Sequence, residues 1–179
     1  MLRALVVGDA VGVLDDAAAA LEMFEPDAVA ACNNMIIHWQ DRLDYAVSLH
    51  PNKCSNWVGL AKAIEQREAA GLNRPEVWAH LPHHAVDRHT KDWGGSSGLL
   101  TVKVLLEEGF DRIVLAGVPL NSHGAHFYAP NELWRTAVQF RKAWNAHLGE
   151  LRGKVKSMRG WTRELLGEPT REWLAGDGS

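Results

Sequence analysis

The chain has 179 residues, of which 46% are apolar and 23% are charged, and its 19 basic and 22 acidic side chains give a formal net charge of −3. This balance is typical of one globular domain and excludes disordered and collagen-like proteins, while the lack of excess positive charge disfavours nucleic acid as a partner. The most apolar stretch, residues 112–120, is far shorter than the roughly 20 residues of a membrane span, so no span is expected.

Cysteine usage and the start of the chain both bear on location. Cys32 and Cys54 are too few for a disulfide framework, which favours a reducing compartment. The first ten residues follow a strand pattern and lack the layout of a signal peptide. We therefore expect a cytoplasmic protein.

Short apolar runs alternate with longer helical patterns along the first two thirds of the chain. The periodicity predicts strands at residues 4–7, 28–32, 45–49, 77–81 and 113–117, and helices at 14–24, 57–70 and 98–108. Strands separated by helices predict a parallel sheet, and the absence of polar alternation predicts burial on both faces. In the first helix, Leu14, Ala18 and Leu21 are expected on one buried face, with Ala17 as a further candidate for it. An antiparallel α+β arrangement is the alternative from pattern alone.

After residue 130 an apolar stripe with steps of three or four residues predicts one long helix. Its positions are Leu133, Ala137, Phe140, Trp144, Leu148 and Leu151. A basic segment at 152–163 and a short helix at 162–166 follow. The basic segment could close over a diphosphate, meet an acidic partner or stay solvated, and the C-terminal helix is a candidate surface for a homo-oligomer or a protein partner.

Together these patterns predict an α/β fold with two parts. Residues 1–150 are expected to form a single Rossmann-like three-layer domain that binds a nucleotide, with a mainly parallel sheet of about five to six strands. Residues 151–179 are expected to form a basic, helical C-terminal appendage packed on it.

In a doubly wound sheet, ligands bind beyond the carboxyl ends of the strands, and this rule selects the loops that could carry chemistry. Ala10 stands where a GxGxxG motif has its second glycine, which argues against an ordinary dinucleotide site. Asn33 and Asn34 could hydrogen-bond a base, a ribose or a sugar, or serve as turn and cap residues. The candidate nucleotide-binding residues at these strand ends are Gly8, Asp9, Ala10, Asn33, Asn34, His50 and Gly117.

The strongest local signal is the sequence DWGGSSG at 92–98, which enters a predicted helix. Amide N–H groups are free at such a helix start and the helix dipole adds partial positive charge, so a phosphate or carboxylate can bind there without a basic side chain. Gly95, Ser96, Ser97 and Gly98 are therefore candidates. The segment lacks the Lys-Ser/Thr pair of a Walker P-loop, and a serine N-cap after a flexible loop is the structural alternative.

Histidine is the most over-represented ionisable residue, with nine in the chain. The histidines clustered at 80–89 could coordinate zinc, but they do not reproduce the HxHxDH order of binuclear metallohydrolases, and no metal site is predicted. His123 and His126 follow the fifth predicted strand. Either could act as general base toward a bound acceptor hydroxyl, because imidazole titrates near neutral pH, or be an ordinary surface histidine.

The segment GGSSGLLTVKVLLEEGFDRIVLAGVPL resembles a turn–helix–strand unit of the bacterial sialyltransferase-like proteins of glycosyltransferase family 42. It is also similar to the archaeal 6-hydroxymethylpterin diphosphokinase-like domain. The opening ALVVGDAVGVLDD…DAVAACNN resembles their first strand–loop–helix–strand, and the closing FYAPNELWRTAVQFRKAW resembles their final helix. Small phage-encoded proteins of uncharacterised function share this layout, and the resemblance covers most of residues 3–150.

The resemblance implies a nucleotide site and a catalytic histidine at positions of this chain. His123 or His126 would stand near the catalytic histidine of the sialyltransferases. Pro119 occupies a position where the family often has aspartate, which removes a carboxylate that could bind ligand or metal. The residues implied to line the nucleotide site are Gly8, Asp9, Asn33, Ser96, Ser97 and Gly98.

The function implied is that of a nucleotide or nucleotide-sugar binding protein, a candidate glycosyltransferase that uses a CMP-sugar-like donor. Apart from such a CMP-like ligand, no cofactor is expected, and the location would be the host cytoplasm if the chain is phage-encoded. The alternative is a non-catalytic phage accessory protein that binds a nucleotide signal or a partner protein.

Overall fold

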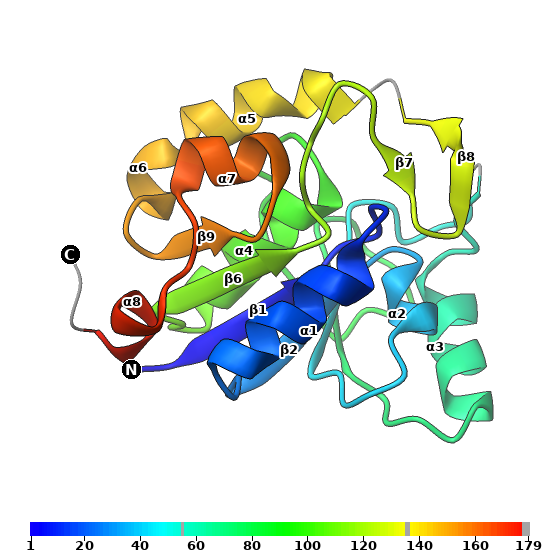
Figure 1. The fold of residues 1–179 in the computed structure, drawn as a ribbon. Helices are drawn as coiled ribbons and strands as arrows, with labels where there is room; N and C mark the ends of the chain where they lie inside the picture. Colours follow the sequence, from blue (N-terminus) through cyan, green and yellow to red (C-terminus); the bar gives the residue numbers. More distant parts are fainter. Residues whose placement is uncertain (55, 135–136, 177–179) are drawn as a thin grey trace.

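The structure is a computed structural model that describes residues 1–54, 56–134 and 137–176. A parallel sheet lies between two layers of helices, which confirms the predicted α/β, Rossmann-like three-layer fold (Figure 1). In spatial order the strands of the main sheet are β5 (Arg88–His89), β4 (Glu76–Ala79), β3 (Tyr45–Ser48), β2 (Ala28–Cys32), β1 (Arg3–Val7), β6 (Arg112–Ala116) and β9 (Val155–Ser157).

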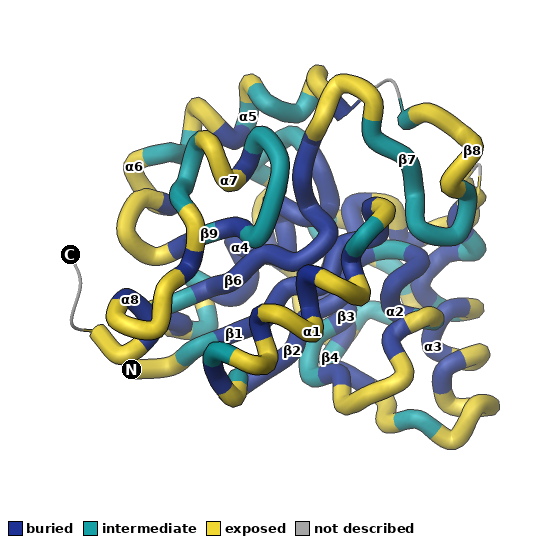
Figure 2. The backbone as a smooth tube through the Cα atoms, in the orientation of Figure 1, coloured by how far each residue is buried: buried dark blue, intermediate teal, exposed yellow. Residues whose placement is uncertain are grey.

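Side chains of each strand alternate between the two faces of the sheet, and each face has its own helices. On β1, Leu5 and Val7 pack on one face, and Ala4 and Val6 pack on the other. The strands between the layers form the buried interior of the molecule (Figure 2). The first face is covered by α1 (Val13–Met23), α2 (Met35–His38), α3 (Leu60–Ala69) and α8 (Arg171–Ala175). The second face is covered by α4 (Ser97–Glu107), η1 (Ala137–Phe140), α5 (Arg141–Ala146) and α6 (Leu148–Leu151).

The two edge strands of the sheet are not predicted by the sequence pattern. β5 has two residues and β9 has three, which is too short for a periodicity to be visible. β9 lies in the segment predicted as an appendage, and it pairs in parallel with β6. α7 (Gly160–Leu166) packs beside β9. Residues 151–176 therefore extend the sheet itself, and a domain boundary near residue 150 stays a prediction.

The buried face of α1 differs from the predicted one. Leu14 and Leu21 are 49% and 41% exposed, and Ala18 also faces solvent. The prediction that these three residues pack on the sheet was therefore wrong, whereas Ala17 is buried as expected. The residues of α1 that are buried are Val13, Asp16, Ala17 and Ala20.

The contacts of Asp16 explain why α1 is rotated about its axis relative to the prediction. Its Oδ1 accepts a hydrogen bond from Nε of Arg159 at 2.6 Å, and its Oδ2 accepts one from the backbone N–H of Gly117 at 3.2 Å. A buried carboxylate is stable only when it is paired, so these contacts hold Asp16 toward the sheet and turn Leu14 to the solvent. An apolar periodicity carries no information about a polar contact between distant segments.

The apolar stripe at 133–151 does not form the single long helix that was predicted. Its start lies in β8 (Ala129–Leu133), which pairs with β7 (Ala125–His126) in an antiparallel hairpin. Pro130 within β8 disfavours a helix there, because proline lacks a backbone N–H. Trp144 and Leu151 are nevertheless fully buried, so the stripe continues across η1, α5 and α6.

Within the described residues, no helix is both long and apolar enough to cross a bilayer.

Arg67 on α3 is fully buried and joins α3 to the end of α2. Its Nε donates to the carbonyl of Asn73 at 2.8 Å, its Nη1 to the carbonyl of Trp39 at 2.5 Å, and its Nη2 to the carbonyl of Asp41 at 2.5 Å. Nη1 also reaches the carbonyl of Ile36 at 3.4 Å, and Nη2 reaches the side-chain oxygen of Asn73 at 3.0 Å. The guanidinium therefore satisfies carbonyl groups that the end of α2 would otherwise leave without donors.

Replacing Arg67 with methionine keeps much of the side-chain volume but removes every donor. We expect the free energy of unfolding to fall by about 3 kcal/mol or more, because several buried carbonyl groups lose their partner. Arg74→Met is the matched control, since Arg74 pairs with Asp87 at the surface and exposed pairs contribute about 0–1 kcal/mol. Urea unfolding followed by circular dichroism measures both variants, and equal losses would contradict the role assigned to Arg67.

Candidate functional site

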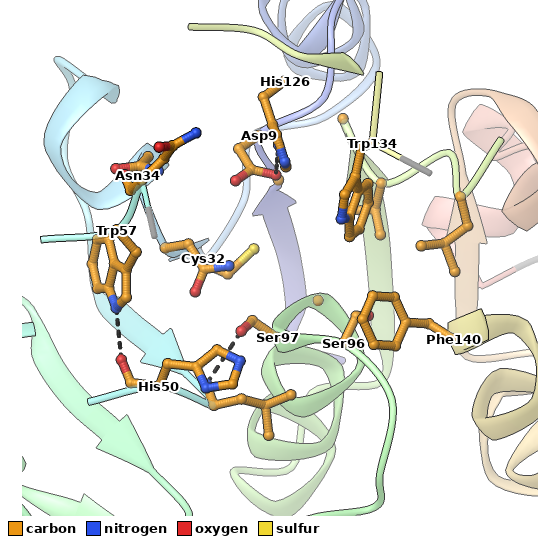
Figure 3. A pocket seen from close by; sticks show the side chains of 18 of the residues that line it. Asp9, Cys32, Asn34, His50, Trp57, Ser96, Ser97, His126, Trp134 and Phe140 are labelled. Atoms are coloured by element: carbon orange, nitrogen blue, oxygen red, sulfur yellow. Dashed lines mark hydrogen bonds and ion pairs between the residues drawn. The ribbon is translucent and has the colours of Figure 1, made fainter. Parts of the chain in front are cut away.

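A cavity of about 450 Å³ lies beyond the carboxyl ends of β1, β2, β3 and β6 and reaches the first turn of α4 (Figure 3). This volume is within the range of about 300–1,000 Å³ that is usual for small-molecule sites. β1 continues to α1 on one face of the sheet, whereas α4 precedes β6 on the other face. The cavity therefore opens at the point where the strand order reverses, which is where doubly wound sheets bind ligands.

Most of the residues predicted as candidates line this cavity. Ala10 does not line it; it forms an isolated β-bridge with His126 instead. His123 does not line it either; it is exposed and contacts the hydroxyl of Ser122. The predicted residues that line the cavity are Gly8, Asp9, Asn33, Asn34, His50, Gly95, Ser96, Ser97, Gly98, Gly117 and His126.

Sequence reasoning missed the apolar and aromatic part of the wall. Trp57 stands on one side of the cavity, and Trp134 and Phe140 stand on the other (Figure 3). The high number of tryptophans is a signal that aromatic rings could contact a ligand, but the sequence does not say which ones do. The missed lining residues are Cys32, Leu49, Cys54, Asn56, Trp57, Val118, Leu120, Tyr128, Trp134 and Phe140.

Two glycines allow the loops after β1 and β6 to meet at the cavity. Gly8 donates its N–H to the carbonyl of Ala116 at 2.8 Å. A Cβ atom on Gly8 would lie 2.3 Å from the carbonyl oxygen of Gly117, which has a φ of 68°. Any larger residue at position 8 would therefore push the two strand ends apart.

Asp9 and His126 form the charged pair of the cavity. Nδ1 of His126 lies 3.3 Å from Oδ1 of Asp9, and both side chains are largely buried. Nδ1 makes no aligned hydrogen bond, so the contact is mainly electrostatic. The Asp9 carboxylate raises the pKa of His126 above its ordinary value, against a smaller opposing effect of burial. The pair thus favours an imidazolium at this position, and Asp9 leaves Nε2 of His126 available for a ligand.

His126 lies at the end of β7, and the aromatic rings of this hairpin stack on one another. The His126 ring lies 5.2 Å from that of Tyr128 in a stacked arrangement and 5.1 Å from that of Trp134. Tyr128 also stacks on His38 at the end of α2, at 6.0 Å. Burial raises the pKa of Tyr128 to about 12, so its phenol stays protonated at neutral pH.

The start of α4 presents hydrogen-bond donors to the cavity. The Oγ of Ser96 accepts bonds from the N–H of Leu99 and from Nε1 of Trp144, both at 3.4 Å. The Oγ of Ser97 accepts a bond from the N–H of Leu49 at 3.2 Å. Neither hydroxyl donates its own proton to another described residue, and both side chains are more than nine-tenths buried. Both protons are therefore available to a ligand in the cavity.

Backbone strain is concentrated at the cavity. Asn33 has a φ of 50° and Leu120 a φ of 47°, and across the described ranges they are the non-glycine residues with positive φ. Ser48 donates its hydroxyl to the side-chain oxygen of Asn33 at 2.9 Å, and Arg141 donates Nε and Nη2 to the carbonyl of Leu120 at 3.0 and 2.8 Å. Strain of this kind is characteristic of functional sites, which supports a functional role for the cavity.

No lysine or arginine is among the described lining residues of the cavity. The basic C-terminal segment does not close over it: Arg159 pairs with Asp16, and Nζ of Lys156 lies 5.2 Å from the ring of Trp173. Positive charge in the cavity must therefore come from His126 or from the dipole of α4.

The histidines at 80–89 do not line the cavity. The rings of His83 and His84 lie 4.1 Å apart, and Nδ1 of His83 accepts the N–H of Ala85 at 3.1 Å, so His83 supports a turn. In the part of the chain that the structure describes, no three His, Cys, Asp or Glu side chains are arranged to hold a metal ion.

No protein-family model matches the chain, and no curated protein or solved structure matches it either.

Cys32 and Cys54 line the same cavity but differ in reactivity. Cys32 is buried, and burial together with the nearby Asp9 carboxylate raises the pKa of its thiol far above the ordinary value. Because the thiolate is the nucleophile, Cys32 is not suited to covalent catalysis at neutral pH. Cys54 is exposed.

We expect iodoacetamide to alkylate Cys54 in the native protein at neutral pH and to leave Cys32 almost unmodified, because Cys32 is both buried and protonated. Mass spectrometry of the Cys54→Ser variant isolates Cys32, which should take up one label only after unfolding in urea. Rapid labelling of Cys32 in the folded variant would contradict this assignment.

Proposed function

We propose that this protein binds a nucleotide or a nucleotide-sugar in the cavity at the carboxyl edge of its sheet. The observation that carries the proposal is the convergence of three features on one cavity: a helix start with free donors, the two buried serine hydroxyls, and the Asp9–His126 pair. The sequence resemblance to sialyltransferase-like proteins points to the same class of ligand.

A phosphate group would bind at the first turn of α4. The backbone N–H groups of Ser97 and Gly98 lie in this turn, where no intrahelical acceptor exists. The hydroxyls of Ser96 and Ser97 add two donors. A phosphate presents acceptor oxygens, so it matches a site built from donors and from the positive end of a helix dipole.

The base and the sugar would occupy the space between the aromatic walls. Trp57 is held in place by a hydrogen bond from its Nε1 to the carbonyl of His50 at 2.6 Å, and Asn34 lies beside it (Figure 3). A flat ring there could stack on Trp57 and bond to the Asn34 amide. The sugar would then extend toward Trp134, beneath His126.

The finer proposal is transfer from a CMP-sugar-like donor. Neutral His126 would keep its Nδ1 proton toward Asp9 and use Nε2 to take the proton of an acceptor hydroxyl. The hydroxyl oxygen then bonds to the anomeric carbon, while the bond from that carbon to the nucleotide phosphate breaks and its electron pair leaves with the phosphate. Asp9 would stabilise the resulting imidazolium, as the carboxylate of a catalytic triad does.

Non-catalytic binding is the second candidate, and the composition of the cavity favours it. Asp9 is the single carboxylate among the described lining residues, Cys32 is unreactive, and proline stands at position 119 where the resembling family often has aspartate. Such a cavity could hold a nucleotide without converting it.

His126→Gln separates the two candidates, because glutamine can donate a hydrogen bond but cannot take up a proton at neutral pH. For a transferase we expect the turnover of a CMP-sugar to fall by about 100-fold or more, far beyond the loss of nucleotide affinity that follows from removing the charge of His126. His123→Gln is the control and should leave turnover unchanged. Wild-type protein that binds a nucleotide yet shows no turnover with any CMP-sugar and hydroxyl acceptor would favour non-catalytic binding.

Titration calorimetry with CMP, CDP, UDP and GDP tests the binding proposal directly. We expect binding of at least one of them, weakened about 5- to 10-fold by Ser97→Ala, since a hydrogen bond to a charged group is lost. Ser122→Ala removes an exposed hydroxyl outside the cavity and should have no effect.

Nucleotide affinity should also fall as pH rises through the raised pKa of His126, because the cavity then loses positive charge. Absence of binding at millimolar nucleotide would remove the proposal.

A further inference from the structure

The hairpin at residues 124–134, here called the hairpin lid, contains β7 and β8 (Figure 1). It contributes His126, Tyr128 and Trp134 to one wall of the cavity, where Figure 3 shows His126 and Trp134. Two backbone hydrogen bonds join it to the loop after β1. Phe127 donates its N–H to the carbonyl of Asp9 at 2.7 Å, and Val11 donates its N–H to the carbonyl of Ala125 at 3.0 Å. A ligand that enters from this side must displace the lid.

The Asp9–His126 pair crosses the boundary between the lid and the body of the protein. Among the described residues, the Asp9–His126 contact is the one ion pair that joins the hairpin lid to the body of the protein. The lid also makes backbone hydrogen bonds, aromatic stacking contacts and apolar contacts of Phe127 and Trp134 with the core, in which no charge takes part.

We propose that the Asp9–His126 pair is a proton-controlled latch, which holds the hairpin lid closed while His126 is protonated and releases it when His126 becomes neutral. The proposal concerns the regulation of the cavity and rests on the proposed function only for the identity of what the lid encloses. Its basis is geometric: a histidine on the hairpin lies 3.3 Å from a largely buried carboxylate on the loop after β1.

The direction of the pH dependence follows from linkage. In the closed lid, Asp9 raises the pKa of His126, whereas in an open lid the imidazole is in water with its ordinary pKa. Protonation therefore favours closure, and closure favours protonation by the same factor. The stabilisation of the closed lid is complete below the ordinary pKa of histidine and is lost as pH rises through the raised pKa.

The other titratable groups around His126 do not provide a competing switch. Tyr128 has a pKa of about 12 and Cys32 a strongly raised one, so both stay neutral near pH 7. Glu132 on β8 also faces His126 and adds a smaller attraction, but it moves with the lid. His38 reaches the group through its ring contacts with Phe127 and Tyr128 of the lid.

Hydrogen exchange of the ligand-free, full-length protein tests the latch. Protection factors are measured from about pH 5.5 to 8.5, the range in which histidine titrates, and are corrected for the intrinsic pH dependence of exchange. We expect the protection of the amides of Val11 and Phe127 to decrease as pH rises, while that of β1 and β6 stays constant. The limiting fold-change equals the ratio of the acid dissociation constants of His126 in the open and closed lid.

Three variants decide whether the latch is responsible. Asp9→Asn and His126→Gln should both remove the pH dependence of lid protection, because either change removes one charge of the pair. His123→Gln, on the exposed loop before the lid, should keep it. If Asp9→Asn disturbs the protection of β1 and β6, His126→Gln gives the deciding result.

The latch is overturned if protection of the lid is independent of pH in the wild-type protein, or if the pH dependence persists in His126→Gln. Because no ligand is present, either result is independent of the calorimetry with nucleotides. Failure of the latch and failure of the proposed function are thus distinguishable.

Discussion

The structure depends on the close contact between Gly8 and Gly117 at the ends of two adjacent parallel strands. β1 and β6 are hydrogen-bonded along their length and separate only after these glycines. A Cβ atom at position 117 would lie 2.5 Å from Cβ of Val13, so the same contact sets how closely α1 approaches the sheet. Because the chain leaves β1 toward one face and enters β6 from the other, a crevice forms beyond the contact.

The crevice offers hydrogen-bond donors, but no lysine or arginine is among its described lining residues. This combination determines what the crevice can bind. The start of α4 and the two serine hydroxyls provide donors, and His126 provides a group that can gain a positive charge. Affinity for an anion and closure of the hairpin lid would then depend on the same proton, that of His126. Protonation would both attract the ligand and hold the lid over it, so the proposal of anion binding and the latch reinforce one another physically while remaining separable by experiment.

The basic C-terminal segment stabilises the fold near the cavity, although its charge alone suggested a ligand or a partner. Arg159 is paired with Asp16, whose other oxygen binds the backbone of Gly117, so this segment fixes the turn after β6. β9 meanwhile extends the sheet beside β6. Basic residues that would suit a diphosphate in isolation are thus used to hold the strand end that forms the cavity.

The amino-acid sequence by itself determined the layers of the fold and the edge of the sheet at which the candidate residues gather. Strands such as β1 and β6 are uniformly apolar and alternate with helices, and the carboxyl ends of parallel strands necessarily lie together, which brings Gly8, Asn33 and the start of α4 to one cavity. The rotation of α1, the hairpin at the start of the predicted long helix and the pairing of Asp9 with His126 were decided only by tertiary structure. Periodicity records which local surfaces are buried, whereas these features arise from polar and steric contacts between residues far apart in the chain.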